Sequence, residues 1–188
     1  MLKKIRKAIR ILVFRLRTQG LWVTLQWAVG RGIPKLTGVP LEMNSAITPT
    51  IYVGPQYNAR GKRWLENKGI NAVINMRTEY DDAKHGLDLQ HYLHLPTIDD
   101  DAPTIKHLQA GVLFIQQILD EGGKVYIHCM GGIGRAPTMA AAYFISTGMT
   151  TDEAIAFIKR KRPFINITPP QLERLRDFEK LTQQEPIH

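Results

Sequence analysis

Residues 124–143 read KVYIHCMGGIGRAPTMAAAY. The apolar run at 125–127 predicts a short buried strand, and the alanine-rich stretch that follows Arg135 predicts a helix. The loop between them begins at Cys129, the only cysteine of the 188 residues, and contains three glycines. A strand, a glycine-rich loop and a helix in this order are typical of a site that holds phosphate.

The loop from Cys129 to Arg135 has the residue types of an anion site. Its glycines permit positive φ angles, so that several backbone N–H groups can point at one centre, and the helix that follows adds its positive dipole end. The same groups favour a thiolate over a thiol, which would make Cys129 a nucleophile at neutral pH. The planar guanidinium of Arg135 can hold two phosphate oxygens at once. We expect the phosphate-binding loop to consist of Met130, Gly131, Gly132, Ile133, Gly134 and Arg135.

The order His128-Cys129-x-x-Gly132-x-x-Arg135 resembles the signature loop of the cysteine-based phosphatases, the protein tyrosine and dual-specificity superfamily. The resemblance implies that Cys129 attacks phosphorus to form a cysteinyl-phosphate intermediate, that Arg135 binds the phosphate and that His128 fixes the loop geometry. It implies no metal and no other cofactor. One departure is Ala136, where the family usually has a hydroxyl that stabilises the departing thiolate, so the turnover rate stays open. The alternative is a buried cysteine in a tight turn.

A general acid is expected in the loop at 96–103, which contains three consecutive carboxylates. The family resemblance places the acid about thirty residues before the cysteine, which favours Asp99. Asp100 or Asp101 could hold the role instead, and an Asp run before Thr104 is also an ordinary way to begin a helix.

Strands alternate with helices over the rest of the chain, which predicts an α/β fold with a mostly parallel central sheet flanked by helices. The resemblance likewise implies a dual-specificity-phosphatase-like domain, which we place at 50–188. The strands are expected at 51–53, 72–75, 91–95 and 125–127, and the helices at 58–68, at 104–121, after Arg135, from Thr150 through a capping box, and from Thr168. We interpret the basic run Lys159–Arg162 as a solvated helix end.

The net charge of +8 comes from the N-terminal segment. Residues 1–41 contain nine basic residues and no Asp or Glu, and the remainder has 16 basic against 17 acidic residues. Residues 1–29 are predicted to be a basic amphipathic helix with two tryptophans, which suits an anionic membrane surface, and 30–49 a Gly/Pro linker. A signal or organelle-targeting peptide, or a helix packed on the catalytic domain, remain alternatives. Nucleic acid is not expected as a partner, because stacking aromatic residues are few.

Within the superfamily the chain resembles the mitochondrial phosphatidylglycerophosphate phosphatase group. The resemblance is carried by residues 72–81, by Thr97-Ile98-Asp99 and by residues 153–172. It implies hydrolysis of a phosphomonoester on a membrane phospholipid such as phosphatidylglycerophosphate, by a peripheral enzyme of an inner or cytoplasmic membrane face. Alternatives are a dual-specificity or tyrosine phosphatase acting on protein, a glucan phosphatase suggested by residues 135–137, and an inactive phosphate-binding module. The uncharged side chains of Met130 and Ile133 argue against a highly charged inositol headgroup.

Overall fold

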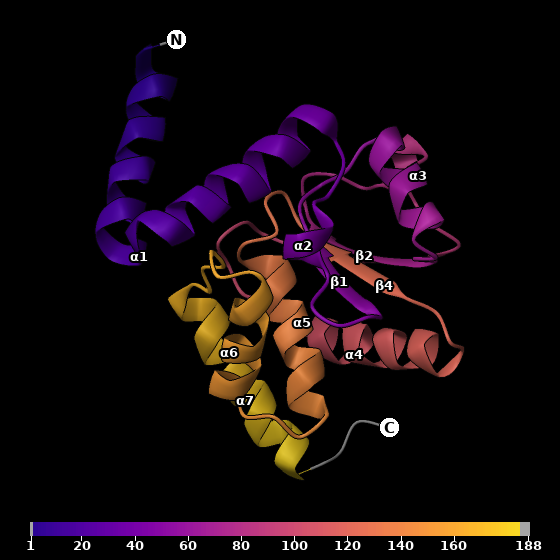
Figure 1. Ribbon diagram of the computed structural model, residues 1–188. Coiled ribbons are helices and arrows are strands. Elements are labelled where there is room, and N and C mark those ends of the chain that lie inside the picture. Colours follow the sequence, from indigo (N-terminus) through magenta and orange to yellow (C-terminus); the bar gives the residue numbers. More distant parts are fainter. Residues whose placement is uncertain (1, 185–188) are drawn as a thin grey trace.

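Four short strands form one parallel sheet in a computed structural model that describes residues 2–184, with the side chains of residues 10 and 12–184 (Figure 1). The strand order is β1-β4-β2-β3. The strands are β1 (Ile51–Gly54), β2 (Ala72–Arg77), β3 (His91–Thr97) and β4 (Val125–His128). At the carboxyl edge His128 is in register with Gly54 on one side and with Asn75 on the other. The loops that follow β1, β2 and β4 therefore meet at one place.

Helices cover both faces of this sheet, as the predicted α/β class requires. They are α3 (Ala59–Asn67), α4 (Ile105–Asp120), α5 (Arg135–Ser146), α6 (Thr151–Lys161) and α7 (Pro169–Gln184), with a 3-10 turn at Ala83–His85. The predicted capping box between Thr150 and Glu153 is present, and the Asn58 side chain also accepts from the backbone at the start of α3. The predicted fold class and the predicted strands and helices of this domain are confirmed.

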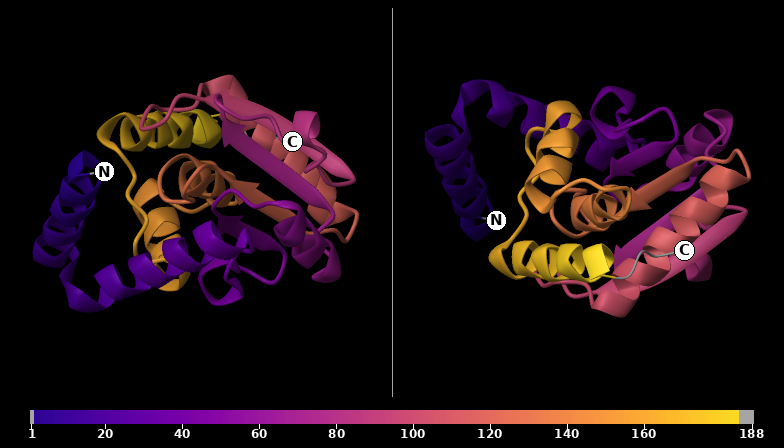
Figure 2. Two further views of the ribbon diagram at one scale, coloured as in Figure 1. Left: turned by 90° about the horizontal axis from the view of Figure 1, so that it is seen from above. Right: turned by 90° about the horizontal axis from the view of Figure 1, so that it is seen from below.

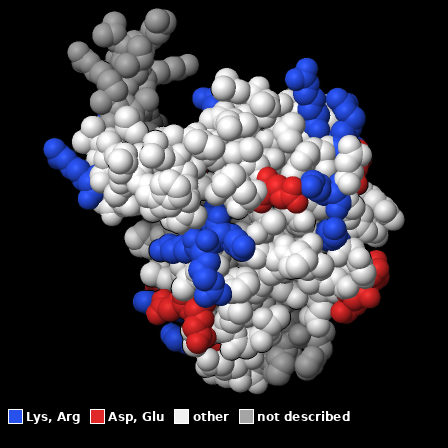
Figure 3. Space-filling view, viewed as in Figure 1, with Lys and Arg blue, Asp and Glu red and all other residues white. Residues whose placement is uncertain are grey.

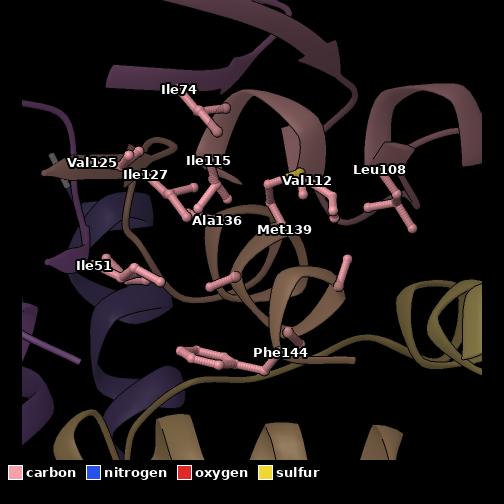
Figure 4. Close-up of a cluster of buried hydrophobic side chains, with 14 of the residues drawn as sticks. Ile51, Ile74, Leu108, Val112, Ile115, Val125, Ile127, Ala136, Met139 and Phe144 are labelled. Atoms are coloured by element: carbon pink, nitrogen blue, oxygen red, sulfur yellow. The ribbon is translucent and has the colours of Figure 1, made fainter. Parts of the chain in front are cut away.

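Two clusters of buried side chains lie on the two faces of the sheet. Val125 and Ile127 of β4 belong to the larger cluster and Tyr126 between them belongs to the smaller one, since successive strand residues point to opposite faces. Figure 4 shows the larger cluster, to which α4 and α5 contribute with the strands. Helix α5 packs against α4, α6 and α7 and is buried over most of its length. Its run of alanines allows that close approach.

The N-terminal helix is longer than predicted. Helix α1 (Leu2–Thr37) bends at Gly20, whose φ of 80° and ψ of 170° are not helical, and Figure 2 shows its two halves meeting at an angle. The linker prediction for 30–49 is wrong for residues 30–37 and for α2 (Glu42–Ser45), which are helical. Gly30 serves packing, because a Cβ there would lie 2.7 Å from the ring of Phe164. Gly38, with a φ of 72°, follows the helix end in the left-handed conformation usual for a terminating glycine.

Met1 and residues 185–188 lie outside the described residues, as do the side chains of residues 2–9 and 11, which belong to the predicted amphipathic helix at 1–29. Within the described part, no helix is both long enough and apolar enough to cross a membrane.

Candidate active site

The loop from Cys129 to Gly134 leaves β4 at the carboxyl edge of the sheet and enters α5 at Arg135. The Cys129 Sγ accepts a hydrogen bond from the Gly132 N–H at 3.2 Å, and the side chain is 3% exposed. Gly132 has a φ of 62°, and a Cβ there would lie 2.4 Å from the carbonyl carbon of Gly54. Only glycine fits this position, so the backbone can curl tightly around the sulfur.

The side chain of Arg162 supports the loop from behind. It is 1% exposed, and it donates from Nε to the Gly132 carbonyl at 2.6 Å and from Nη2 to the Gly131 carbonyl at 3.2 Å. In a trans peptide the C=O and the next N–H point in opposite directions. The N–H groups of Gly132 and Ile133 therefore point away from Arg162, toward the side of the loop on which the sulfur lies. This arrangement suits a tetrahedral oxyanion.

The interpretation of Lys159–Arg162 as a solvated helix end is wrong for Arg162. The first three residues of the run are exposed, but Arg162 turns inward, donates from Nη1 to the Asn44 carbonyl at 2.9 Å and stacks on the Phe164 ring at 4.7 Å. Burial lowers its pKa to about 10, so it stays protonated at neutral pH. The sequence carried no local sign of this role, because the carbonyls that Arg162 binds lie at least 30 residues away along the chain.

The guanidinium of Arg135 is held by two carboxylates and two carbonyls, one of which is the Met76 carbonyl at 3.4 Å from Nη1. Its Nη1 and Nη2 donate to Glu79 at 2.9 and 3.0 Å, its Nη1 also donates to the Thr97 carbonyl at 2.8 Å, and its Nη2 lies 2.8 Å from Asp99 Oδ1. The hydrogen bonds from Arg135 hold the pKa of Glu79 at about 2. In the described part of the chain the buried Nε of Arg135 has no partner, so one donor of this side chain is free for an incoming oxygen.

A partly buried polar network leads from the loop to Glu79. His128 Nε2 lies 2.6 Å from Asp82 Oδ2, and neither side chain is exposed. Asp82 Oδ1 accepts from Gln56 Nε2 at 2.9 Å, Gln56 Oε1 accepts from Arg77 Nη1 at 2.8 Å, and Arg77 Nε donates to Glu79 Oε1 at 2.9 Å. The residue before the cysteine is thereby connected to the carboxylate that orients the loop arginine.

The three candidate acids have different surroundings. Asp99 and Asp100 line the same cavity as the thiol, and Asp99, whose side chain is 70% exposed, contacts the loop arginine. Asp101 instead accepts from its neighbour Ala102 N at 2.7 Å, and its carbonyl accepts from Gln171 Nε2 at 3.0 Å. This geometry favours Asp99 for the acid role and makes Asp100 the remaining candidate.

The cavity over the loop has a volume of about 360 Å³, and α1 forms one of its walls. Arg15, Trp27 and Arg31 of α1 line it together with Cys129 and the acid loop. Helix α1 therefore packs on the catalytic domain, but through a face that includes two arginines instead of through its apolar side. Among residues 2–184, no three His, Cys, Asp or Glu side chains gather as a metal site would require.

The comparison with known families agrees with this geometry. The family "Dual specificity phosphatase, catalytic domain" matches residues 51–181. The chain belongs to this family. Its catalytic domain is that of a cysteine-based phosphatase, and the predicted membership of the protein tyrosine and dual-specificity superfamily is confirmed.

Several relatives of the dual-specificity phosphatase family are similar over most of this domain. Human phosphatidylglycerophosphatase and protein-tyrosine phosphatase 1 is 32% identical over 144 residues, which are 71% of this chain and 72% of that protein. Human dual specificity protein phosphatase 5 is 35% identical over 133 residues, 69% of this chain and 33% of that protein. The chain thus spans about a third of the length of the latter. The predicted relation to the phosphatidylglycerophosphate phosphatase group is confirmed.

Solved structures of this family have the same fold. The crystal structure of PTPMT1 in complex with PI(5)P superposes with a TM-score of 0.68 at 32% identity and covers 73% of this chain and 95% of that one. The crystal structure of Tk-PTP in the active form gives a TM-score of 0.66 at 28% identity, covering 73% of this chain and 97% of that one.

Proposed function

We propose that the protein hydrolyses phosphomonoesters through a cysteinyl-phosphate intermediate. The observation that supports this most directly is the placement of Cys129 Sγ beneath inward-pointing loop N–H groups, with the free Nε of Arg135 at the other end of the loop. The thiolate of Cys129 attacks phosphorus, the bond to the leaving oxygen breaks, and Arg135 stabilises the charge on the equatorial oxygens. Asp99 donates the proton that the leaving oxygen needs.

Water then cleaves the phosphorus–sulfur bond, and Asp99 takes up the proton of that water as inorganic phosphate forms. The thiolate that departs is stabilised by the Gly132 N–H. Ala136, fully buried in the first turn of α5, offers it no hydroxyl. The second step therefore depends on backbone donors to a greater degree than in relatives with Ser or Thr at this position.

We propose a phospholipid with a terminal phosphomonoester, such as phosphatidylglycerophosphate, as the substrate. A relative named phosphatidylglycerophosphatase and protein-tyrosine phosphatase 1 supports this choice, as does the structure of PTPMT1 in complex with PI(5)P. Met130, 46% exposed at the loop, adds an apolar contact and no charge. Phosphoprotein is the alternative substrate, because the family also includes the dual specificity protein phosphatases.

We further propose that α1 attaches the protein to an anionic membrane surface, as a peripheral protein. The apolar face of the part of α1 that follows Gly20 consists of side chains between 41 and 87% exposed, namely Leu21, Trp22, Leu25, Val29, Ile33 and Leu36. Figure 3 shows an uncharged stretch of surface along α1 with basic side chains at its borders. Nine basic and no acidic residues within 1–41 would attract anionic lipid, and the indole of Trp22 suits the interface.

The substrate proposal is tested by phosphate release from phosphatidylglycerophosphate vesicles and from phosphotyrosyl peptides, measured side by side with the full-length protein. We expect kcat/KM for the lipid to exceed that for the peptides by at least about 10²-fold, which corresponds to about 2.7 kcal/mol of transition-state binding. The reverse preference would assign the protein to the dual-specificity protein phosphatases. Release from neither substrate, with inorganic phosphate still bound, would indicate an inactive module.

The membrane proposal predicts that Trp22→Ser combined with Leu25→Ser weakens binding to anionic vesicles at least about tenfold, because burial of such side chains contributes 1.5–3 kcal/mol or so each. Vesicle sedimentation at low and high salt measures this. The matched control is Leu113→Ser combined with Leu181→Ser, two leucines each 43% exposed on α4 and α7. Equal weakening by the two pairs would show that α1 is not the attachment site.

A further inference from the structure

Two arginines of α1 line the active-site cavity from opposite sides of the bend at Gly20. Arg15 precedes the bend and Arg31 follows it, and both belong to the cavity that contains Cys129. The backbone angles at Gly20 lie in a region that is essentially restricted to glycine. A helix without this bend could not bring both arginines to the same cavity, since 16 residues of straight helix span about 24 Å.

Among the described residues, Arg15 is buried without a charged partner. It is 9% exposed, its Nη1 donates to Gln19 Oε1 at 2.8 Å and to the Phe164 carbonyl at 3.5 Å, and its guanidinium stacks on the Trp27 ring at 4.8 Å. Burial, and then the nearby charge of Arg31, lowers the pKa of Arg15. Each partner is neutral, so a buried positive charge remains uncompensated, which is costly.

Arg31 lies directly beside the phosphate loop. A Cβ built on Gly131 would be 3.4 Å from Arg31 Nη1. Within the described residues no carboxylate lies within 4.0 Å of Arg15 or Arg31. The acidic residues of the cavity, Asp99 and Asp100, belong to the loop after β3, and Asp99 contacts Arg135. Two cations thus face the cavity with no anion paired to them.

We propose that Arg15 and Arg31 form a second anion subsite, which binds a phosphodiester of the same substrate whose phosphomonoester occupies the loop. This inference rests on the proposed phosphatase function and narrows it to molecules that carry both groups. A glycerophospholipid with a terminal phosphomonoester has this chemistry. Guanidinium groups bind phosphate oxygens in bidentate fashion, and the ring of Trp27, on which Arg15 stacks, adds an apolar part to the cavity wall.

The test uses a water-soluble substrate, so that attachment to a membrane does not enter. Glycerophosphoglycerol phosphate, the deacylated form of phosphatidylglycerophosphate, carries both groups, whereas para-nitrophenyl phosphate carries only the phosphomonoester. We expect Arg31→Gln and Arg15→Gln each to lower the ratio of kcat/KM for the first substrate to that for the second about tenfold, mainly through KM. Arg17→Gln, which removes an exposed charge from the same helix, is the matched control and should leave the ratio unchanged.

Arg31→Gln is the variant that is less disruptive to the fold, because Arg31 is exposed and its replacement removes none of the contacts that Arg15 makes within the protein. The subsite would be overturned if Arg31→Gln lowered kcat/KM equally for both substrates. It would also be overturned if Arg17→Gln lowered the ratio of the two kcat/KM values as much as Arg31→Gln does. Failure of the wild-type protein to hydrolyse para-nitrophenyl phosphate would instead contradict the proposed phosphatase function. Arg31→Gln could also lower kcat/KM on phosphatidylglycerophosphate vesicles while leaving kcat/KM on the deacylated substrate unchanged. That result would assign the arginines to lipid-surface binding and would also overturn the subsite.

Discussion

Replacement of Cys129 by serine is expected to lower kcat by at least about 10⁴-fold, the order of magnitude that follows the loss of a catalytic nucleophile. The serine hydroxyl is far less acidic than the thiol, so the same loop N–H groups cannot generate the nucleophile. The side chain is 3% exposed and serine is slightly smaller, so the fold should persist. Single-turnover phosphate release from para-nitrophenyl phosphate measures the effect.

The control for this experiment is binding of inorganic phosphate, measured by calorimetry. We expect Cys129→Ser to bind phosphate with an affinity within about tenfold of the wild type, because Arg135 and the loop N–H groups are unchanged. A variant that still turns over, or that unfolds, would contradict the assignment of Cys129 as the nucleophile in a preformed site.

Replacement of Arg162 by methionine is expected to affect both stability and catalysis. The change leaves the carbonyls of Gly131, Gly132 and Asn44 without their charged donor. Relief of the buried charge offsets part of that loss, so we expect about 2–4 kcal/mol less free energy of unfolding, measured by urea denaturation. This corresponds to a fall in Tm of roughly 5–15 °C for a chain of this size.

The catalytic consequence of Arg162→Met should be a fall in kcat of about 10²-fold at a temperature where the variant is folded, comparable with the loss of one oxyanion donor. The loop N–H groups would no longer be fixed toward the sulfur. Arg160→Met is the matched control, because Arg160 is exposed two residues earlier and contacts the Phe157 ring at 4.7 Å. If Arg162→Met and Arg160→Met lowered kcat equally, the cause would be the loss of a positive charge from this region and not the loss of the hydrogen bonds to the loop.

Local signals in the sequence predicted the parts of the site that lie within a few residues of one another. The spacing from Cys129 to Arg135, the apolar runs of the strands and the capping box at Thr150 are each set by their neighbours in the chain. They indicated the sheet, the loop and the helix after it. Asp99 was placed by the family resemblance, and the structure shows that it reaches Arg135.

The rest of the site depends on contacts that are distant in sequence. In the sequence, Arg162 is the last residue of a basic run and cannot be distinguished from its exposed neighbours. Its inward orientation toward Gly132 depends on the path of the chain after α6. The glycines and the proline at 30–38 indicated a linker, whereas Gly30 allows close packing on Phe164. Composition alone cannot distinguish a flexible glycine from one that allows close contact, because both require the absence of a side chain.

The two faces of α1 restrict the length of any lipid headgroup that reaches the loop. Trp27 and Arg31 line the cavity, while Trp22, Leu25 and Val29 are exposed on the opposite side of the same helix. If α1 rests on a bilayer as proposed, about one helix diameter, ~10 Å, separates the acyl chains from the cavity. A phosphate attached directly to diacylglycerol, as in phosphatidic acid, would be too short to span this distance. A phosphomonoester at the far end of a glycerol phosphodiester extends further, so α1 would select substrates by reach as well as by charge.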